Sequence, residues 1–183
     1  MRELIFLKVV KFFLENPYEE AYLRQLAKRL NLSSFAIKKY ADLLVREDFI
    51  KEERKANLRY FKANTNNLFF KHLKIAFNIN IILKSGLLDF LKENLVNVSS
   101  IVLFGSTAKG NDDKNSDIDI LIIGKEKYLD LVKFEEKIDK EITLRIFSWS
   151  EWNKQATENK AFYSDVISHG IPLNGELPLI QWK

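Results

Sequence analysis

The sequence of 183 residues predicts a two-domain α+β protein whose domains are joined by a helical connector. Three observations lead to this fold class. Apolar residues recur at helical spacing early in the chain, and two short strand-like segments follow them. Residues 68–95 are mainly apolar and contain few helix breakers. Two continuously apolar strand patterns then flank a turn that contains glycine, as expected for a small α/β domain.

The net charge of +4 is divided unevenly along the chain. Residues 1–80 carry +7, from 16 Lys and Arg against 9 Asp and Glu, whereas residues 81–183 carry −3. All six glycines also lie in the second part, beginning at Gly86. Such asymmetry indicates units with different partners. We expect the domains at residues 1–64 and 97–183, with the connector at residues 65–96.

The composition excludes several classes of protein. The chain has no Cys, which excludes disulfides, a thiol nucleophile and Cys-bound metals, and its two histidines argue against a polyhistidine metal centre. No apolar run approaches the ~20 residues of a membrane span, and the N-terminus lacks the pattern of a signal peptide. We therefore expect a cytoplasmic protein without membrane association.

The first domain is expected to contain three helices and a hairpin. Asn16-Pro17 ends the first helix, Asn31-Leu32 forms a short turn, and Ser33 or Ser34 caps the third helix. This order is that of a winged helix-turn-helix. The expected elements are helices at residues 3–14, 20–30 and about 34–47, and strands at residues 49–54 and 58–62.

The stretch Tyr22–Ser33 resembles the first half of the DNA-binding motif in archaeal and bacterial transcription regulators, and the resemblance spans about residues 1–63. It implies that the third helix enters the major groove and that the hairpin contacts DNA as a wing. The alternatives are a packing module with a solvated charged face, or a protein–protein module. The residues implied in DNA binding are Ser34, Phe35, Lys38 and Lys39 on the helix, and Arg54, Lys55, Asn57 and Arg59 on the hairpin.

The connector is expected to form one or two helices, with a break at Ser85-Gly86. Its apolar surface predicts either intramolecular core or the interface of a homodimer. His72 is interpreted as a surface or interface residue of this segment.

The chemistry is expected in residues 100–123. Residues 100–104 form a buried strand, Gly105-Ser106 begins a short helix that ends at Gly110, and residues 117–123 form a second buried strand. Glycine lets a ligand approach the backbone, and free amides at a helix N-terminus attract phosphate. Asp117 and Asp119, two apart on a strand, project from one face, where they can hold Mg²⁺ against a triphosphate.

This segment resembles the nucleotidyltransferase superfamily that includes DNA polymerase β and kanamycin nucleotidyltransferase. The form Phe-Gly-Ser-x-Ala-Lys-Gly at residues 104–110, followed by Ser-Asp-Ile-Asp at residues 116–119, is similar to the minimal nucleotidyltransferases fused to a winged helix in archaea. The resemblance implies a mixed sheet and transfer of a nucleoside monophosphate from NTP to an acceptor hydroxyl. The implied roles are catalysis and Mg²⁺ binding for Asp117 and Asp119, and nucleotide binding for Gly105, Ser106 and Lys109.

The family's third carboxylate lies on a later strand, expected here at residues 141–147. By alignment, Thr143 stands in the place of that acid. Glu141 shares its face by strand parity and is the candidate third acid, and Glu151 is a more distant one. Arg145 lies on the same face and can contact phosphate. Without a third acid, nucleotide and metal binding are expected to survive while turnover is in question.

The remaining elements complete the fold. An amphipathic helix is expected at residues 126–139, a helix containing Trp152 is capped by Ser148 or Ser150, and a final helix ends near Gly170 with His169 as a capping cation. The tail at residues 170–176 resembles the end of minimal nucleotidyltransferase domains.

Two main hypotheses follow. The first is an active nucleotidyltransferase with a DNA-binding winged helix. The second is a DNA-binding transcription regulator, or an antitoxin with a small helical toxin as partner, whose degenerate domain binds nucleotide without turnover. Thr143 favours the second, and the intact Gly-Ser and Asp-x-Asp motifs favour the first.

Overall fold

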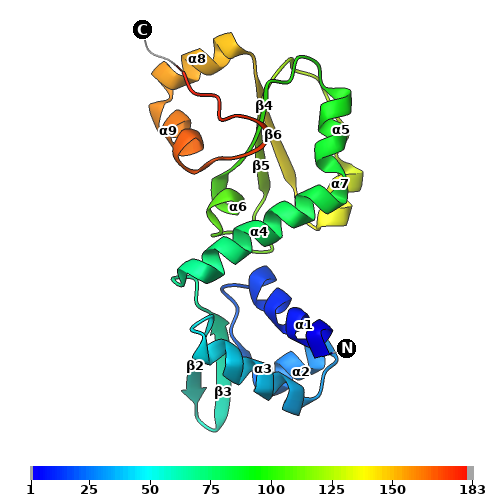
Figure 1. Ribbon diagram of the computed structural model, residues 1–183, viewed down its shortest axis with the longest axis vertical. Helices are drawn as coiled ribbons and strands as arrows, with labels where there is room; N and C mark the ends of the chain where they lie inside the picture. The colour runs from blue at the N-terminus through cyan, green and yellow to red at the C-terminus, as the bar shows by residue number, and fades with distance from the viewer. Residues whose placement is uncertain (1, 181–183) are drawn as a thin grey trace. The chain divides into compact units, whose positions relative to one another are not determined.

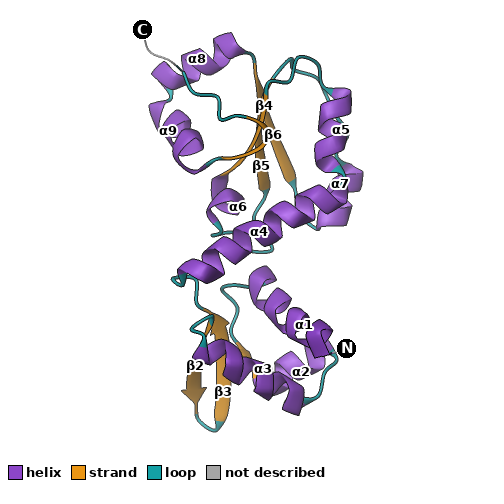
Figure 2. Ribbon diagram, in the orientation of Figure 1, coloured by secondary structure: helices purple, strands orange, loops and turns teal. Residues whose placement is uncertain are grey.

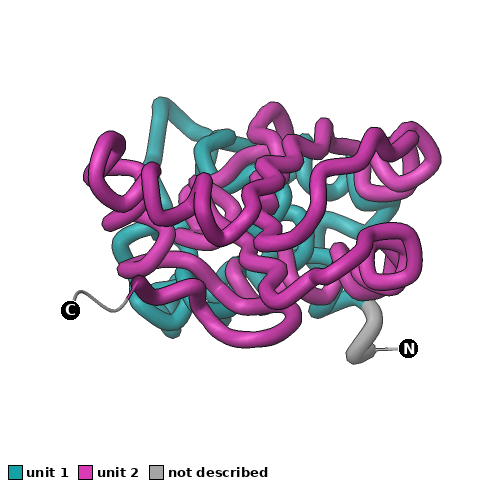
Figure 3. The backbone as a smooth tube through the Cα atoms, turned by 90° about the horizontal axis from the view of Figure 1, so that it is seen from above, with its two compact units in different colours: residues 1–74 teal, residues 75–183 magenta. Residues whose placement is uncertain are grey.

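The computed structural model describes residues 2–180, with side chains from Ile5 onward. The chain divides into two compact units, residues 1–74 and residues 75–183 (Figure 3). The division falls inside helix α4 (Leu68–Ser85). Across residues 2–180, no helix combines the length and apolarity that crossing a membrane requires.

Unit 1 contains three helices, the start of α4 and a small antiparallel sheet (Figure 1). Its strands are ordered β1-β3-β2, and β2 and β3 form the expected hairpin. Phe13, Leu26, Ile37 and Phe61 are fully buried and contribute to its core. The elements are α1 (Arg2–Glu15), β1 (Ala21–Tyr22), α2 (Leu23–Leu30), α3 (Ser34–Arg46), β2 (Ile50–Lys55) and β3 (Leu58–Ala63).

The start of the second helix differs from the prediction. The helix expected from residue 20 begins at Leu23, because Ala21 and Tyr22 pair with Phe61 and Tyr60 of β3. Helical spacing of the apolar residues does not reveal this pairing, which depends on a strand some forty residues later. The third helix is capped by Ser33, whose Oγ accepts a hydrogen bond from the Ala36 amide at 3.2 Å.

Unit 2 is built on a mixed four-stranded sheet, as predicted (Figure 2). The strand order is β6-β5-β4-β7, in which β5 and β6 are parallel and the other pairs are antiparallel. The elements are the end of α4, α5 (Leu87–Asn94), β4 (Ser100–Phe104), α6 (Gly105–Lys109), β5 (Ile118–Ile123), α7 (Val132–Ile138), β6 (Ile142–Phe147), α8 (Trp149–Glu158), α9 (Lys160–His169) and β7 (Ile171–Gly175).

Helices cover both faces of this sheet (Figure 1). Alternate residues of β4 and β5 point to opposite sides, so the two strands contribute to two apolar clusters. Ile101, Leu103 and Ile120 pack with α5 and α7, whereas Val102 and Leu121 pack with α8 and α9. Burial on both faces fixes β4 and β5, which carry the candidate site at their ends.

The helix expected at residues 126–139 is shorter than predicted. Helix α7 covers only Val132–Ile138. Asp130 Oδ1 accepts a hydrogen bond from the Val132 amide at 3.1 Å, which fixes a turn before the helix. Leu129 and Leu131 still pack against the core from this non-helical segment, so their apolar pattern has a different structural cause.

Candidate functional site

Strand β4 leads into a tight turn at Gly105, the first residue of α6. All five residues of β4 are buried. Gly105 has a φ of +72°, in the left-handed region that other residues rarely adopt. Helix α6 ends at Gly110, which is also left-handed. Glycine therefore stands at both ends of α6 because the backbone requires it there.

The carboxylate of Asp119 lies against Gly105. Strands β4 and β5 pair with Phe104 opposite Asp119. A Cβ added at position 105 would overlap Asp119 Oδ2 and lie 3.1 Å from Asp119 Cγ. The structure therefore brings together the Gly-Ser turn and the Asp-x-Asp motif, and Asp119 can occupy its position only because residue 105 has no side chain.

Asp117 lies just before β5, which begins at Ile118 and not at Asp117 as predicted. Its side chain is exposed. Its backbone carbonyl accepts a hydrogen bond from Thr107 Oγ1 at 3.0 Å. Helix α6 is thus tied directly to the residue that carries the first carboxylate.

The two carboxylates influence each other electrostatically. Burial raises the pKa of Asp119 above its ordinary value of 3.8, and the negative charge of Asp117 raises it further. The positive charge of Arg145 acts in the opposite direction on the same pKa. Ionised Asp119 therefore costs the folded protein free energy, as is common for functional carboxylates.

Thr143 lies beside Asp119, at the position where the third acid was sought. The parallel register of β5 and β6 pairs Asp119 with Thr143 and Ile118 with Ile142. Glu141 precedes β6, and its carbonyl accepts a hydrogen bond from the Ile118 amide at 2.9 Å. Its side chain is exposed. Glu141 therefore lies at the Asp117 end of the site.

The other candidates from β6 onward have defined contacts. The guanidinium of Arg145 lies 5.1 Å from the centre of the Phe162 ring, an orienting cation–π contact. Glu151 Oε2 accepts hydrogen bonds from the Ser148 amide and Oγ, both at 2.7 Å. Glu151 therefore closes a capping box at the start of α8, and its carboxylate is engaged there.

Lys109 is also paired within the protein. Its Nζ lies 2.5 Å from Asp165 Oδ1 in α9, and His169 Nδ1 lies 3.1 Å from the same oxygen. The hydrogen bond from Lys109 is the main cause that lowers the pKa of Asp165. A phosphate at α6 would have to compete with Asp165 for the Lys109 ammonium.

An open hollow of about 550 Å³ adjoins Asp117. One wall is the loop before β5, and the other is the segment between α7 and β6. Most of its lining residues are charged, and acidic side chains outnumber basic ones. The lining residues are Lys114, Asn115, Ser116, Asp117, Glu135, Asp139, Lys140 and Glu141.

The carboxylates of Asp117 and Asp119 have the chemistry that Mg²⁺ requires, since this hard cation prefers oxygen ligands. Among residues 2–180, no group of three His, Cys, Asp or Glu side chains is arranged to hold a metal. Two protein carboxylates leave several positions of an octahedral shell for phosphate oxygens and water, which suits an ion that arrives with a nucleotide.

Sequence reasoning missed three residues that hold the loop before Asp117. Asp112 is fully buried and forms an ion pair with Lys140, with 2.8 Å between Oδ2 and Nζ. Asn78 of α4 donates to Asp112 Oδ1 at 2.7 Å. A run of seven polar residues between two buried segments was the available signal, because such a loop cannot be held by apolar packing.

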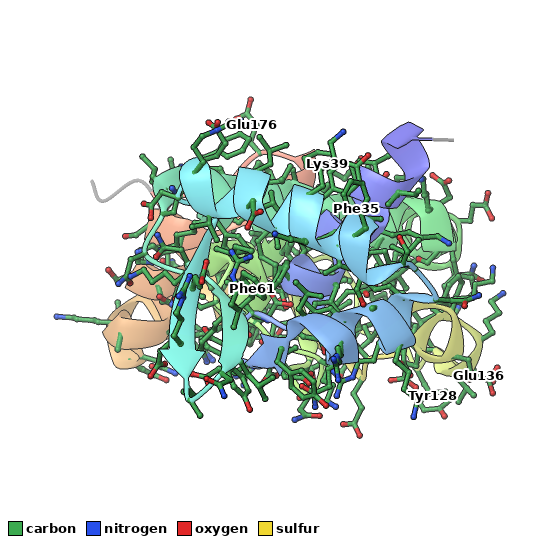
Figure 4. All side chains as sticks on the ribbon, turned by 90° about the horizontal axis from the view of Figure 1, so that it is seen from below. Phe35, Lys39, Phe61, Tyr128, Glu136 and Glu176 are labelled. Atoms are coloured by element: carbon green, nitrogen blue, oxygen red, sulfur yellow. The ribbon has the colours of Figure 1, made fainter. Side chains whose placement is uncertain are left out.

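In unit 1, the predicted DNA-binding residues of α3 lie on its exposed side. The four residues lie near the N-terminus of the helix, and the first of them is also the first residue of α3. The Phe35 side chain is 79% exposed. Figure 4 shows Phe35 and Lys39 on this helix. Phe35 therefore presents an exposed ring about one helical turn before the exposed Lys38 and Lys39. The four residues are Ser34, Phe35, Lys38 and Lys39.

The hairpin cations are instead paired with acidic side chains. Arg59 donates to both carboxylate oxygens of Glu52, at 2.8 and 2.6 Å, and also contacts Asp42. These hydrogen bonds raise the pKa of Arg59. Lys55 contacts Glu20 at 2.5 Å, and Arg54 lies 3.5 Å from Glu52.

One family of known domains matches part of the chain. Residues 84–169 match the model of the nucleotidyltransferase domain family. The match begins at the end of α4 and extends to the end of α9, so it includes both motifs of the candidate site.

One solved structure that matches the chain is titled "Crystal structure of the toxin-antitoxin with AMP-PNP". It is 24% identical, the match covers 54% of this chain and 74% of that one, and the TM-score is 0.37. This score is too low to transfer any property of that complex. No curated protein matches the chain.

We expect Gly105→Ala to destabilise the protein through two effects: the left-handed φ and the overlap with Asp119. The first costs about 1 kcal/mol, and the second adds about 1–3 kcal/mol. Gly86→Ala is the matched control, because Gly86 has a φ of +83° and an added Cβ there meets no atom within 4 Å. Urea unfolding of both variants measures the difference. If Gly105→Ala and Gly86→Ala lose the same unfolding free energy, an added Cβ at position 105 does not collide with Asp119.

We expect Asp119→Asn, measured without metal, to stabilise the protein at pH 7. Folding raises the pKa of Asp119, so the folded state loses stability as pH rises through that pKa. The gain from the variant should therefore shrink as pH falls below the ordinary value of 3.8. Asp165→Asn is the control of opposite sign, because folding lowers the pKa of Asp165. Thermal unfolding of the two variants, Asp119→Asn and Asp165→Asn, at pH 3 and pH 7 measures these changes in stability. A gain that is the same at pH 3 and pH 7 would contradict the expected linkage.

Proposed function

We propose that unit 2 transfers a nucleoside monophosphate from Mg²⁺·NTP to an acceptor hydroxyl, with release of pyrophosphate. The observation that carries this proposal is the contact of the Asp119 carboxylate with Gly105. It supports the proposal because a carboxylate, which could bind Mg²⁺, lies beside the start of α6, where backbone amides could bind phosphate. The match of residues 84–169 to the nucleotidyltransferase domain family supports it.

In this proposal the acceptor oxygen forms a bond to the α-phosphorus, and the bond from that phosphorus to the pyrophosphate oxygen breaks. Gly105 and Ser106 hold the triphosphate, and Lys109 exchanges Asp165 for a phosphate oxygen. Asp117 and Asp119 would hold Mg²⁺, and the bound ion would neutralise charge on the phosphates. Glu141, the exposed carboxylate at the Asp117 end of the site, takes the proton from the acceptor hydroxyl.

We expect label transfer from NTP to a component of a cell extract that depends on both carboxylates. Asp117→Asn and Asp119→Asn should each lower the rate at least about 100-fold, because each removes a ligand of the catalytic metal. The experiment incubates purified protein with Mg²⁺, each labelled NTP and the extract.

The role of Glu141 is tested in the same assay. Glu141→Gln should lower the rate and shift its pH dependence, whereas Glu136→Gln, at an exposed position of α7, should leave the rate unchanged. Transfer that persists in Asp117→Asn and Asp119→Asn would contradict the proposed site. Transfer that depends on both but not on Glu141 would remove Glu141 from the mechanism.

A second candidate function is a DNA-binding regulator, or an antitoxin, whose unit 2 binds nucleotide without turnover. Thr143 beside Asp119 favours it, because a threonine hydroxyl is neither a strong metal ligand nor a general base. In this proposal unit 1 is a winged helix-turn-helix, its order of helices and hairpin being the supporting observation. The apolar connector favours a homodimer, and the resemblance to minimal nucleotidyltransferases implies a small helical toxin as partner.

The ion pairs of unit 1 indicate which residues would contact DNA. Arg59 would have to leave two carboxylates to reach a phosphate, which makes it a structural cation of the hairpin. Lys38 and Lys39 form no ion pair with any residue in the described part of unit 1, and both are exposed. The second candidate therefore assigns the main phosphate contacts to α3.

We expect Lys38→Ala/Lys39→Ala to weaken binding to duplex DNA and to reduce the slope of log K against log salt by about 2, since two phosphate contacts disappear. Lys154→Ala/Lys160→Ala removes the same charge from exposed positions of unit 2 and is the matched control. Fluorescence anisotropy with labelled genomic fragments, measured over a range of salt, provides both values. If both double variants weaken DNA binding equally, the binding depends on the overall charge of the protein and not on α3.

A further inference from the structure

The loop at residues 111–117 contains no apolar side chain, although it lies between buried segments and delivers Asp117 to the candidate site. Lys114, Asn115 and Asp117 are exposed, whereas Asp112 is fully buried. Hydrophobic packing therefore cannot fix this loop, and its conformation depends on polar contacts.

Those contacts converge on a buried cluster that we name the Asp112 cluster: Asn78, Asp112 and Lys140. One carboxylate oxygen of Asp112 accepts from Asn78 Nδ2 at 2.7 Å, and the other accepts from Lys140 Nζ at 2.8 Å. Asn78 is 4% exposed, and the Lys140 side chain is 14% exposed. The charges are thus removed from water and paired on both sides of one carboxylate.

The cluster also holds the backbone around the loop. Asn78 Nδ2 donates to the Thr107 carbonyl at 3.1 Å, and Lys140 Nζ donates to the Asp113 carbonyl. Thr107 in turn donates through Oγ1 to the Asp117 carbonyl. The cluster therefore joins α4, α6, the loop and the segment before β6. It contacts the backbone both before the loop, at Thr107, and inside it, at Asp113.

Inside the loop, Asp113 continues this network. Its Oδ1 accepts from the Asn115 amide and from Ser116 Oγ, both at 2.9 Å, and Ser116 Oγ accepts from the Asp113 amide at 3.0 Å. These local bonds shape the turn, but they do not connect it to the rest of unit 2. The bond from Lys140 to the Asp113 carbonyl provides that connection.

A buried ion pair adds little to stability compared with apolar residues of the same size, because desolvation offsets the attraction. Hydrogen bonds between charged groups nevertheless require a defined geometry, so they can fix the direction in which the loop leaves the core. Lys140 also lines the hollow beside Asp117, so the same side chain holds one wall of the hollow against the other.

We propose that the Asp112 cluster positions Asp117 for binding Mg²⁺·NTP, with Lys140 as the positioning residue that connects the loop to β6. This inference rests on the proposed function of unit 2. Asn78, Asp112 and Lys140 touch no substrate atom in this proposal and act through the loop.

The test compares Lys140→Met with Lys137→Met in the full-length chain. Lys137 is the matched control, because its Nζ donates to the Ser85 carbonyl at 3.2 Å and does not contact the loop. A third variant, Asp112→Leu/Lys140→Met, replaces both charges and so avoids leaving a buried carboxylate unpaired. Three quantities are measured: the melting temperature, the Kd for the tightest-binding Mg²⁺·NTP, and amide hydrogen exchange at residues 113–117.

We expect Lys140→Met and the double variant to raise the Kd at least 10-fold and to speed exchange in the loop. Lys137→Met should match the wild type in both. The double variant should recover the melting temperature lost by Lys140→Met, but not the affinity. Recovery of affinity together with melting temperature would reduce the cluster to a structural role and overturn the proposal. An unchanged Kd in both cluster variants would also overturn it.

Failure of the proposed function is distinguishable from failure of this inference. If the wild type binds none of the four NTPs in a Mg²⁺-dependent way, the nucleotidyltransferase proposal fails, and exchange alone then decides the role of the cluster. Faster exchange at residues 113–117 in Lys140→Met but not in Lys137→Met would support loop positioning, and equal exchange would overturn it.

Discussion

The contact between the Asp119 carboxylate and the bare Cα of Gly105 is the constraint on which the site depends. It exists because β4 and β5 pair with Phe104 opposite Asp119. Apolar clusters on both faces of the sheet prevent either strand from shifting by one residue, since such a shift would turn every buried side chain to the wrong side. The core of unit 2 thus supplies the precision of the contact. Burial, followed by the negative charge of Asp117, raises the pKa of the Asp119 carboxyl at this position.

Features dictated by local chemistry could be predicted from the sequence, whereas pairings between distant residues could not. Gly105 and Asp119 could be predicted because a left-handed turn favours glycine and a proposed metal site requires carboxylates. Lys140 was missed because it lies 28 residues from Asp112, and lysine and aspartate are ordinarily surface residues. The length of α7 was overestimated for a related reason: Leu129 and Leu131 are apolar because they pack, not because they are helical.

The charges of unit 1 are a second case in which pairings between distant residues could not be predicted from the sequence. The sequence assigns +7 to residues 1–80, and the hairpin looked like a basic wing. In the fold, Glu20 and Glu52 reach Lys55 and Arg59, and the first of these partners is 35 residues from its lysine. The net charge remains, and Lys38 and Lys39 of α3 are among the exposed cations that form no ion pair with a described residue. A charge count along the sequence therefore identifies a basic unit, whereas only the fold shows which of its cations are paired.

The choice between turnover and nucleotide sensing depends on how the site balances negative charge. A third carboxylate at position 143 would lie beside Asp119, whose pKa is already raised by burial and by Asp117. Thr143 removes that repulsion, and Arg145 offers a positive charge two residues further along β6. Under either proposed function, such a site would have one carboxylate fewer to attract metal and an arginine that could attract phosphate, which would favour nucleotide binding over proton abstraction. Turnover then requires a base from outside the Asp119–Thr143 pair, and Glu141 is the carboxylate that the register of β6 places at the Asp117 end.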